Sequence, residues 1–171
     1  MRRGKIYYDI LRTRTFGEVL IASTEAGLFR IQFPVRGKHP RRLLDKIQPG
    51  AEITRDRPRL NTVSRQLKEY LQGRRKRFNV KLDLRDKAPF SRRVLLKTSK
   101  IPYGKTVTYG ELARSCGCPG GARAVGQVMA KNPLPIIIPC HRVLASDGKL
   151  GGYSGGLKYK RMLLDLEGVK V

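Results

Sequence analysis

Apolar and polar positions alternate in three short runs near the start of the chain, at residues 6–10, 16–22 and 28–33. Such alternation puts one face of a strand in a core and the other in water, so each run predicts a half-buried strand. Residues 24–27, Thr-Glu-Ala-Gly, separate the last two runs and predict a hairpin turn. A basic loop is expected over residues 34–40.

The following apolar positions recur at a helical spacing. Residues 41–47 predict a short helix. A longer amphipathic helix, ended by Gly73, has apolar residues at every third or fourth position: Leu60, Val63, Leu67 and Leu71. Alternation then returns and predicts another strand, with Phe78, Val80, Leu82 and Leu84 on one face. Residues 1–86 are therefore expected to form a small α/β domain, a sheet with one or two helices.

The sequence Asp-Lys-Ala-Pro at residues 86–89 indicates a domain boundary. Beyond it, Ser91 is expected to cap a helix that ends before Ile101. The pattern after this boundary is mostly helical, and residues 87–171 are expected to form a second, mostly α domain of winged-helix type.

Two further helices are predicted in this second domain. Thr108 and Glu111 have the spacing of a capping box, so a helix is expected to begin at Tyr109. A glycine-rich turn over residues 115–121 separates it from a helix at 122–131. Two short helices joined by a glycine-bearing turn resemble a helix-turn-helix, although this turn is somewhat long for that motif.

The helix at 122–131 has one apolar face and one face that is almost bare. The apolar positions stand at i, i+3 and i+4 and predict a core face: Val125, Val128 and Met129. The opposite face consists of Arg123, Gly126, Gln127 and Ala130. A helical glycine costs about 1 kcal/mol relative to alanine, so Gly126 calls for a reason. Close approach to another molecule is one, and packing against a second helix of the same fold is the other.

The net charge of the chain indicates which class of molecule it binds. Lys and Arg number 37 against 13 Asp and Glu, which gives a formal net charge of +24 at pH 7. The excess is +14 up to Arg85 and +10 beyond it, so it is not confined to a tail. Such a field favours a polyanion, above all nucleic acid. A ribosome-associated or simply well-solvated basic protein is the alternative.

Other features of the sequence favour the cell interior. No apolar stretch approaches the roughly 20 residues of a membrane span, and the first residues form no signal peptide. Three cysteines, few and odd in number, indicate a reducing compartment and not a disulfide scaffold. A cytoplasmic protein is therefore expected.

The candidate chemistry lies at residues 135–144, Pro-Ile-Ile-Ile-Pro-Cys-His-Arg-Val-Leu. The apolar run is expected to be buried, and Pro139 restricts one more backbone dihedral before the thiol of Cys140. His141 can accept the thiol proton and leave a thiolate, the nucleophilic form of cysteine. A small buried cysteine beside an unrelated surface histidine is the plainer alternative.

Two features outside residues 135–144 bear on the candidate chemistry of Cys140. Residues 148–156 contain five glycines and predict a mobile or tightly curved loop over a pocket; a phosphate loop would require a lysine where Leu157 stands. Glu167 lies at the end of the last helix, where the helix dipole disfavours an anion. A cationic partner such as His141, or an ordinary surface ion pair, would explain it.

No metal and no other cofactor is expected. Cys116 and Cys118 are separated by one residue, and Cys140 is adjacent to His141. Neither arrangement has the ligand spacing of a structural zinc site.

The order and spacing of the motifs over residues 90–168 resemble the O6-alkylguanine-DNA alkyltransferases, or methylated-DNA–protein-cysteine methyltransferases. The matching residues are Arg-Ala-Val-Gly at 123–126, Asn-Pro at 132–133, Pro-Cys-His-Arg-Val at 139–143 and Gly-Tyr-Ser-Gly-Gly at 152–156. The resemblance implies that residues 1–86 have a ribonuclease-H-like fold. Some relatives hold zinc in that domain through Cys and His, but this chain has only His39 there, so that site is expected to be missing.

The resemblance also implies catalytic roles. Cys140 would take the alkyl group from O6 of guanine, His141 would draw off the thiol proton, and Glu167 would orient the imidazole. Tyr109 would donate to the leaving purine and press on the phosphate beside the target nucleotide. Asn132 would hold the turn that supports the pocket.

Further residues would contact the DNA or the alkylated base. Arg123 would enter the stack in place of the flipped base, and the bare helix face would lie in the minor groove. Other DNA contacts would come from Tyr109, Gly110, Gly126, Gln127, Ala130 and Ser146. The substrate pocket would be lined by Met129, Pro135, Val143, Gly151, Tyr153 and Ser154. It is expected to be tightly packed, because it must exclude water.

The implied function is direct repair of double-stranded DNA. The protein would flip O6-alkylguanine out of the duplex and transfer the alkyl group irreversibly to Cys140, once per molecule. It would act as a monomer on DNA in the cytoplasm, with O4-alkylthymine left open as a second substrate. Two other classes stay open: a sensor of alkylated bases that recruits repair factors, and a winged-helix-like regulator in which Cys140 is a redox switch.

Overall fold

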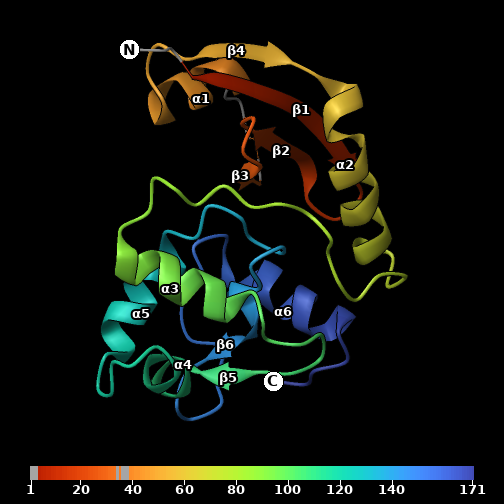
Figure 1. Cartoon of the computed structure of the whole chain (residues 1–171). Coiled ribbons are helices and arrows are strands. Elements are labelled where there is room, and N and C mark those ends of the chain that lie inside the picture. Colours follow the sequence, from red (N-terminus) through yellow and green to blue (C-terminus); the bar gives the residue numbers. More distant parts are fainter. Residues whose placement is uncertain (1–3, 34, 36–38) are drawn as a thin grey trace. The chain divides into compact units, whose positions relative to one another are not determined.

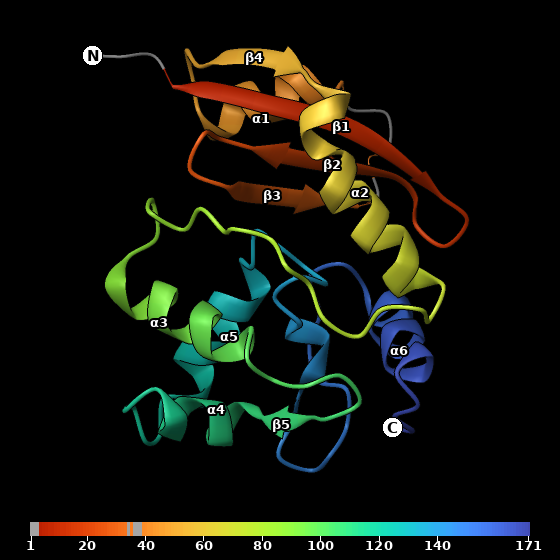
Figure 2. The same cartoon turned by 45° about the vertical axis from the view of Figure 1, so that its right-hand side comes forward.

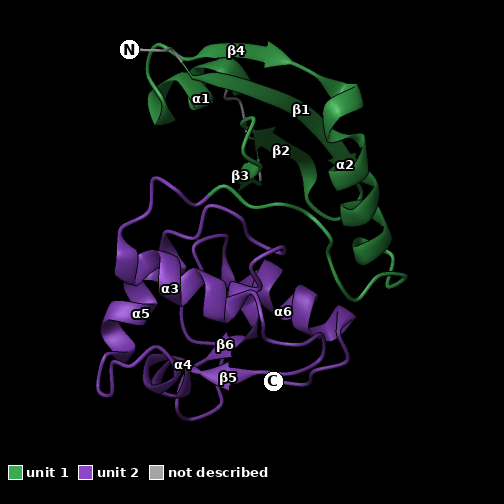
Figure 3. Cartoon of the chain, in the orientation of Figure 1, with its two compact units in different colours: residues 1–83 green, residues 84–171 purple. Residues whose placement is uncertain are grey.

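The computed structural model, shown in Figures 1 and 2, describes residues 4–33, 35 and 39–171. The basic loop expected over residues 34–40 lies mostly outside these residues. The chain divides into two compact units, residues 1–83 (unit 1) and residues 84–171 (unit 2), which Figure 3 colours separately.

Unit 1 is built on a four-stranded sheet with the order β3-β2-β1-β4. β1 (Lys5–Thr13), β2 (Gly17–Ser23) and β3 (Leu28–Gln32) are antiparallel neighbours, which confirms the three strands expected from alternation. β4 (Glu52–Arg55) pairs parallel to β1 and was not predicted. Only Ile53 of its four residues is buried, so the sequence shows no alternating pattern there.

Two helices complete unit 1 and confirm the helical spacing in the sequence. α1 spans Pro40–Ile47 and α2 spans Arg57–Leu71. α2 ends just before Gly73, whose φ of +72° is the left-handed conformation that closes many helices. The sheet and α1 share an apolar cluster that includes Ile6, Leu20, Ala22, Leu44 and Ile53.

The strand expected at residues 78–84 is wrong. In the described chain this segment makes an isolated bridge to the sheet, between Leu82 and Leu28. Further back, the Gln66 side chain accepts the amide of Asn79 at 2.9 Å and donates to its carbonyl at 3.2 Å. Backbone groups engaged by a side chain cannot join a strand ladder. The alternation therefore marks an extended, half-buried segment.

Unit 2 is mainly helical. Its helices are α3 (Pro89–Thr98), α4 (Tyr109–Ser115), α5 (Ala122–Ala130) and α6 (Leu157–Leu166). α3 packs against α4 and α5, as both views show. A short parallel ladder joins β5 (Val107–Thr108) to β6 (Val143–Leu144), and a 3-10 turn, Cys140–Arg142, immediately precedes β6.

The helix starts in unit 2 test the capping predictions. Thr108 Oγ1 accepts the Glu111 amide at 3.1 Å and Glu111 Oε2 accepts the Thr108 amide at 2.6 Å, so the capping box is confirmed. The Ser91 cap is wrong. α3 begins earlier, after Ala88, because Pro89 fits the first helical position, where a missing N–H costs nothing. None of the described helices has the length and apolarity needed to cross a membrane.

Candidate active site

A sharp turn presents Cys140. The chain approaches it through Ile136, a β-branched residue with φ +76°, a left-handed conformation that such residues rarely adopt. Ile138 O accepts the amide of Cys140 at 2.8 Å at the start of the 3-10 turn. Strained backbone of this kind persists only where its surroundings enforce it, and it concentrates at functional sites.

The side chain of Asn132, just beyond α5, fixes this turn. Its Nδ2 donates to Ile138 O at 2.8 Å and lies 3.1 Å from Cys140 Sγ. Its Oδ1 accepts the Leu134 amide at 3.0 Å. Because one side chain bonds the backbone twice and the thiol once, Asn132 sets both the path of the turn and the orientation of the sulfur.

Cys140 is buried, with 4% of its surface exposed. Burial raises the pKa of its thiol, because the charged form is poorly solvated inside the protein. The hydrogen bond from Asn132, the positive charge of Lys160 and a hydrogen bond from Tyr153 act in the opposite direction. The sulfur is therefore enclosed, with three side chains beside it that stabilise a thiolate when its proton leaves.

A buried ionic network lies next to Cys140. His141 Nε2 is 2.9 Å from Glu167 Oε1, so the expected pairing of these two side chains is present, although the cation of the network is Arg142. Arg142, which was not predicted, donates to the same carboxylate through Nε at 2.9 Å and Nη2 at 2.7 Å. The Gly104 amide adds a bond of 3.0 Å. A carboxylate held by a bidentate arginine stays ionised and fixed in place.

This network determines the state of His141. Burial lowers the pKa of the imidazole, although hydrogen bonding and charge from Glu167 oppose the shift. A neutral imidazole that faces an ionised carboxylate through Nε2 carries its proton on that nitrogen. Nδ1 is then the basic atom, so His141 can accept a proton there.

Lys160 on α6 lies under the glycine-rich loop. It is fully buried, and its Nζ donates to Val143 O at 2.6 Å and also to Leu150 O and Gly152 O. Burial lowers the pKa of Lys160 to about 8. The side chain thus ties the loop to β6 and places a titratable charge near the thiol.

A pocket of about 510 Å³ opens at Cys140, within the size range of small-molecule sites. Its wall comes from α4, α5 and the segment after β6. The lining residues are Tyr109, Gly110, Ala122, Arg123, Gly126, Met129, Ala130, Cys140, Ala145, Ser146, Gly152, Tyr153 and Ser154. The expected tight packing holds at His141, but Gly152 and Ser154 are exposed, so the loop side of the pocket is open.

Tyr109, the first residue of α4, forms one wall of the pocket. Its hydroxyl donates to Gly152 O at 3.2 Å, and burial raises its pKa, so it is a protonated donor. A Cβ on Gly151 would lie 3.3 Å from the tyrosine ring, and Gly151 has φ +63°. Both facts explain a glycine there, because the loop passes close to the ring in a left-handed conformation.

The outward face of α5 borders the pocket. Val125, Val128 and Met129 are buried, as their spacing predicted, and the opposite side is exposed. A Cβ on Gly126 would meet no atom within 4 Å. Packing inside the fold therefore does not explain this glycine. Its missing side chain leaves the face open to another molecule.

Some sequence-predicted residues lie off the pocket wall. Val143 is fully buried in β6, Pro135 is bridged to Ile138, Gln127 is exposed farther along α5, and Gly151 packs behind Tyr109. Asn132, His141 and Glu167 are not among the lining residues either; Asn132 contacts Cys140 Sγ, and Glu167 contacts His141.

Sequence reasoning missed two important residues, Arg142 and Lys160. The sequence nevertheless carries a signal for each. Arg142 directly precedes the apolar residues Val143 and Leu144, and the carboxylate of Glu167 at a helix end calls for a cation. Lys160 stands three and four positions before the core residues Leu163 and Leu164, which places it on the inward face of α6.

The remaining cysteines lie apart from this site. Cys116 is buried and Cys118 is partly exposed, both just beyond α4, and all three cysteines are free thiols. Among the described residues, no three His, Cys, Asp or Glu side chains gather as metal ligands would.

The sequence matches one family along both units. Residues 6–84 match the 6-O-methylguanine DNA methyltransferase, ribonuclease-like domain, and residues 89–169 match the DNA binding domain of the same family. The chain is 40% identical over 163 residues to the methylated-DNA–protein-cysteine methyltransferase of Methanosarcina acetivorans, which covers 95% of this chain and 99% of the relative. The Mycobacterium tuberculosis protein of that name is 51% identical over 102 residues, 60% of this chain and 61% of the relative.

Solved structures extend the likeness to three dimensions. The crystal structure of Mycobacterium tuberculosis OGT in complex with DNA has a TM-score of 0.80 at 36% identity, covering 94% of this chain and 92% of that one. The O6-methylguanine-DNA methyltransferase from Pyrococcus kodakaraensis has a TM-score of 0.66 at 27% identity, covering 96% and 99%. The fold class expected from the sequence is confirmed.

Proposed function

This chain belongs to the family of methylated-DNA–protein-cysteine methyltransferases, and we propose that Cys140 is the residue on which it accepts the alkyl group. It is a DNA repair protein that acts by alkyl transfer. One observation carries the assignment: of the three cysteines, only Cys140 is among the residues that line the described pocket, with Asn132 Nδ2 3.1 Å from its sulfur.

The surrounding residues supply each step of the transfer. His141 accepts the thiol proton at Nδ1, and Glu167 stabilises the imidazolium that results. The sulfur then attacks the alkyl carbon, so that a C–S bond forms while the bond from carbon to O6 breaks. The electron pair of that bond stays on the purine, which takes a proton from the Tyr109 hydroxyl. That hydroxyl is bonded to Gly152 O, so it must turn to reach the purine.

Transfer requires the target base to leave the duplex. The sulfur of Cys140 is buried, and an alkyl group on O6 cannot reach it while the base is stacked. We therefore propose base flipping, with the exposed Arg123 at the pocket filling the gap in the stack. The open face of α5 at Gly126 would lie in the minor groove.

Three finer points belong to the same proposal. The thioether is stable, so each molecule acts once. O4-alkylthymine is a second substrate, because its alkyl group is held by the same kind of exocyclic oxygen on a smaller ring. Every residue assigned to the transfer lies within unit 2, so one copy of the chain suffices for the reaction and the protein acts as a monomer. Its free thiols suit a reducing cytoplasm, where it would associate with DNA.

Methyl-labelled DNA tests the assignment. The unmodified protein should take up one label per molecule, and Cys140→Ser should take up none while binding duplex nearly as well, because the binding face lies on α5. Cys118→Ser, a partly exposed cysteine beyond the pocket, is the matched control and should label fully. Label on the Cys140→Ser protein would disprove the assignment. No label on the unmodified protein would favour a sensor or a redox regulator.

A comparison of two substrates tests base flipping. Arg123→Ala should reduce repair of duplex DNA by roughly 10²-fold, because flipping costs a few kcal/mol of unstacking that the arginine offsets. Reaction with the free base O6-benzylguanine should be nearly unchanged, since a free base is not stacked. Arg65→Ala, an exposed arginine of α2, is the control for lost charge. Equal losses on both substrates would mean that Arg123 shapes the pocket.

A further inference from the structure

The outward side of α3 carries a dense group of cations that the proposed reaction does not use. α3 buries Val94, Leu95 and Thr98. Beyond Pro89, the exposed positions of this helix and its end are Arg92, Arg93, Leu96, Lys97 and Lys100, which we call the α3 basic surface. Leu96, 42% exposed, is the apolar member of this group.

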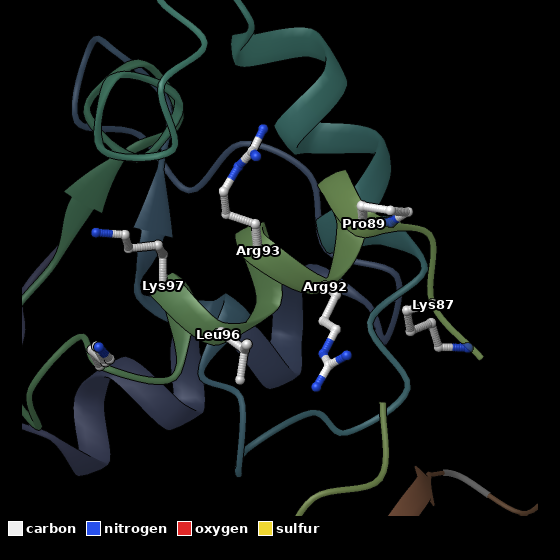
Figure 4. A pocket seen from close by; sticks show the side chains of 7 residues that line it. Lys87, Pro89, Arg92, Arg93, Leu96 and Lys97 are labelled. Atoms are coloured by element: carbon white, nitrogen blue, oxygen red, sulfur yellow. The ribbon is translucent and has the colours of Figure 1, made fainter. Parts of the chain in front are cut away.

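This surface borders a hollow of about 450 Å³, which Lys87 and Pro89 also line (Figure 4). In Figure 4, Arg92 and Leu96 project to one side of the helix, and Arg93 and Lys97 to the other. The cations therefore flank α3 on both sides, as spacings of one and four residues along a helix require.

The charges of the α3 basic surface are not neutralised within the described chain. Lys87 is ion-paired to Asp86 at 2.7 Å, but Arg92, Arg93, Lys97 and Lys100 have no ion pair among the described residues. Arg93 and Lys97 stand at i,i+4 and Lys97 and Lys100 at i,i+3, spacings at which like charges repel and destabilise a helix. An anionic partner would relieve this repulsion.

The α3 basic surface is separate from the α5 face. α3 and α5 pack together through buried side chains, with Thr98 Oγ1 on α3 3.6 Å from Met129 Sδ on α5. No residue of the α3 basic surface lines the pocket at Cys140 or belongs to the outward face of α5. The α3 basic surface is therefore available to a DNA segment other than the one held at α5.

We propose that the α3 basic surface binds the phosphates of a second DNA segment, so that one molecule bridges two duplexes. Residues 92–98 span about 9 Å of α3, with Lys100 just beyond its end, and a duplex carries one phosphate charge per roughly 1.7 Å of its axis. Several phosphates can thus face the four cations, and Leu96 can contact deoxyribose. The surface combines four cations with one exposed apolar side chain and no acidic residue, a composition that fits the phosphates of nucleic acid better than an acidic protein. The proposal relies on the proposed function only for the first duplex, held at α5.

Two variants with equal loss of charge isolate the effect. In the first, Arg92, Arg93, Lys97 and Lys100 are changed to Ala. In the control, four exposed cations on α1 and α2 are changed to Ala: Arg41, Arg42, Lys46 and Lys68. The net charge falls from +24 to +20 in both proteins. Reaction with free O6-benzylguanine reports the fold and the site independently of DNA, and it should be unchanged in both.

The measurement is sedimentation of the full chain with an excess of a short duplex of about 12 base pairs. The unmodified protein and the control should form complexes of one protein with two duplexes, whereas the α3 variant should stop at one. The second binding step should weaken by roughly 10²-fold between 50 and 200 mM salt, as about four phosphate contacts predict.

Distinct outcomes separate the two proposals. If the unmodified protein stops at one duplex, or if both four-residue variants lose the second duplex alike, the α3 proposal is wrong. In the first case an acidic protein becomes the partner to consider for this surface. If no protein binds even one duplex while reaction with the free base persists, the failure lies in the proposed duplex binding at α5.

Discussion

The two units bury charged groups in opposite ways. In unit 1, the buried Asp9 pairs with Arg55 at 3.0 Å, and the arginine side chain is 62% exposed. In unit 2, Glu167 pairs with His141 and Arg142, whose side chains are 0% and 7% exposed, and its own side chain is fully buried. One unit therefore leaves half of its ion pair in water, and the other removes a whole network from it.

The buried network of unit 2 costs more free energy of desolvation than the half-exposed ion pair of unit 1. Taking two charges out of water costs several kcal/mol per ion, and their attraction only offsets this when the geometry is good. An apolar cluster of similar volume would serve stability equally well, as the cluster around Ile6 and Leu44 does in unit 1. The network in unit 2 is explained by what it holds, a basic imidazole beside a buried thiol.

Removing one carboxylate from each unit gives the largest expected difference. Glu167→Gln should lower the free energy of unfolding by about 3–5 kcal/mol, because Arg142 stays buried without its counterion. Asp9→Asn should cost about 1 kcal/mol or less, because Arg55 is still solvated. Denaturant unfolding at pH 7 measures both. Equal losses in the two variants would mean that the burial of the network does not set its energetics.

The sequence predicted the elements whose signal is local. The strands β1 to β3, the capping box at Thr108 and the inward face of α5 each follow from spacing or from a short polar motif, and all are confirmed. β4 was not predicted, because it pairs with β1, which is distant in the sequence, and only one of its four residues is buried. The false strand at 78–84 arose because Gln66, far away in sequence, takes the backbone groups of Asn79.

The predictions for the site divide in the same way, into local signals that the sequence shows and long-range contacts that it does not show. The motif around Cys140 is contiguous, and the pairing of His141 with Glu167 could be anticipated from an anion at a helix end. Arg142 and Lys160 were not predicted as site residues, because a charged residue in a sequence is normally assigned to the protein surface. Only the fold shows that Lys160 on α6 reaches three carbonyl groups beneath the loop.

The buried lysine gives the next effect, in the pH dependence of stability. The pKa of Lys160 falls from 10.5 to about 8 on burial. Between these values the unfolded chain binds more protons than the folded one, so the free energy of unfolding should rise with pH, by up to about 3 kcal/mol in total. Below about pH 8 the folded protein carries the buried charge and lacks this gain.

Lys160→Met isolates that contribution. The difference in unfolding free energy between the unmodified protein and this variant should grow from pH 7 to pH 10.5 in favour of the unmodified protein. Lys5→Met removes an exposed lysine from unit 1 and is the matched surface control. A difference for Lys160→Met that stays flat would show that the ammonium is solvated.

The smallest effect concerns the alkylated product and should be confined to unit 2. Cys140 Sγ has Asn132 Nδ2 at 3.1 Å on one side and the pocket of about 510 Å³ on the other, so a methyl group can extend into the pocket without crowding. The alkylated sulfur has no S–H left to donate and is only a weak acceptor for the Asn132 amide, a loss of about 1 kcal/mol. That corresponds to a drop in melting temperature of about 4–8 °C for a cooperative unit of this size.

A benzyl ring can also contact Met129 and Ala130 in the pocket wall, so its adduct should melt above the methyl adduct. Calorimetry of the unmodified, methylated and benzylated proteins gives the order. A benzyl adduct that melts below the methyl adduct would mean that the pocket is closed in solution, as the sequence alone had suggested.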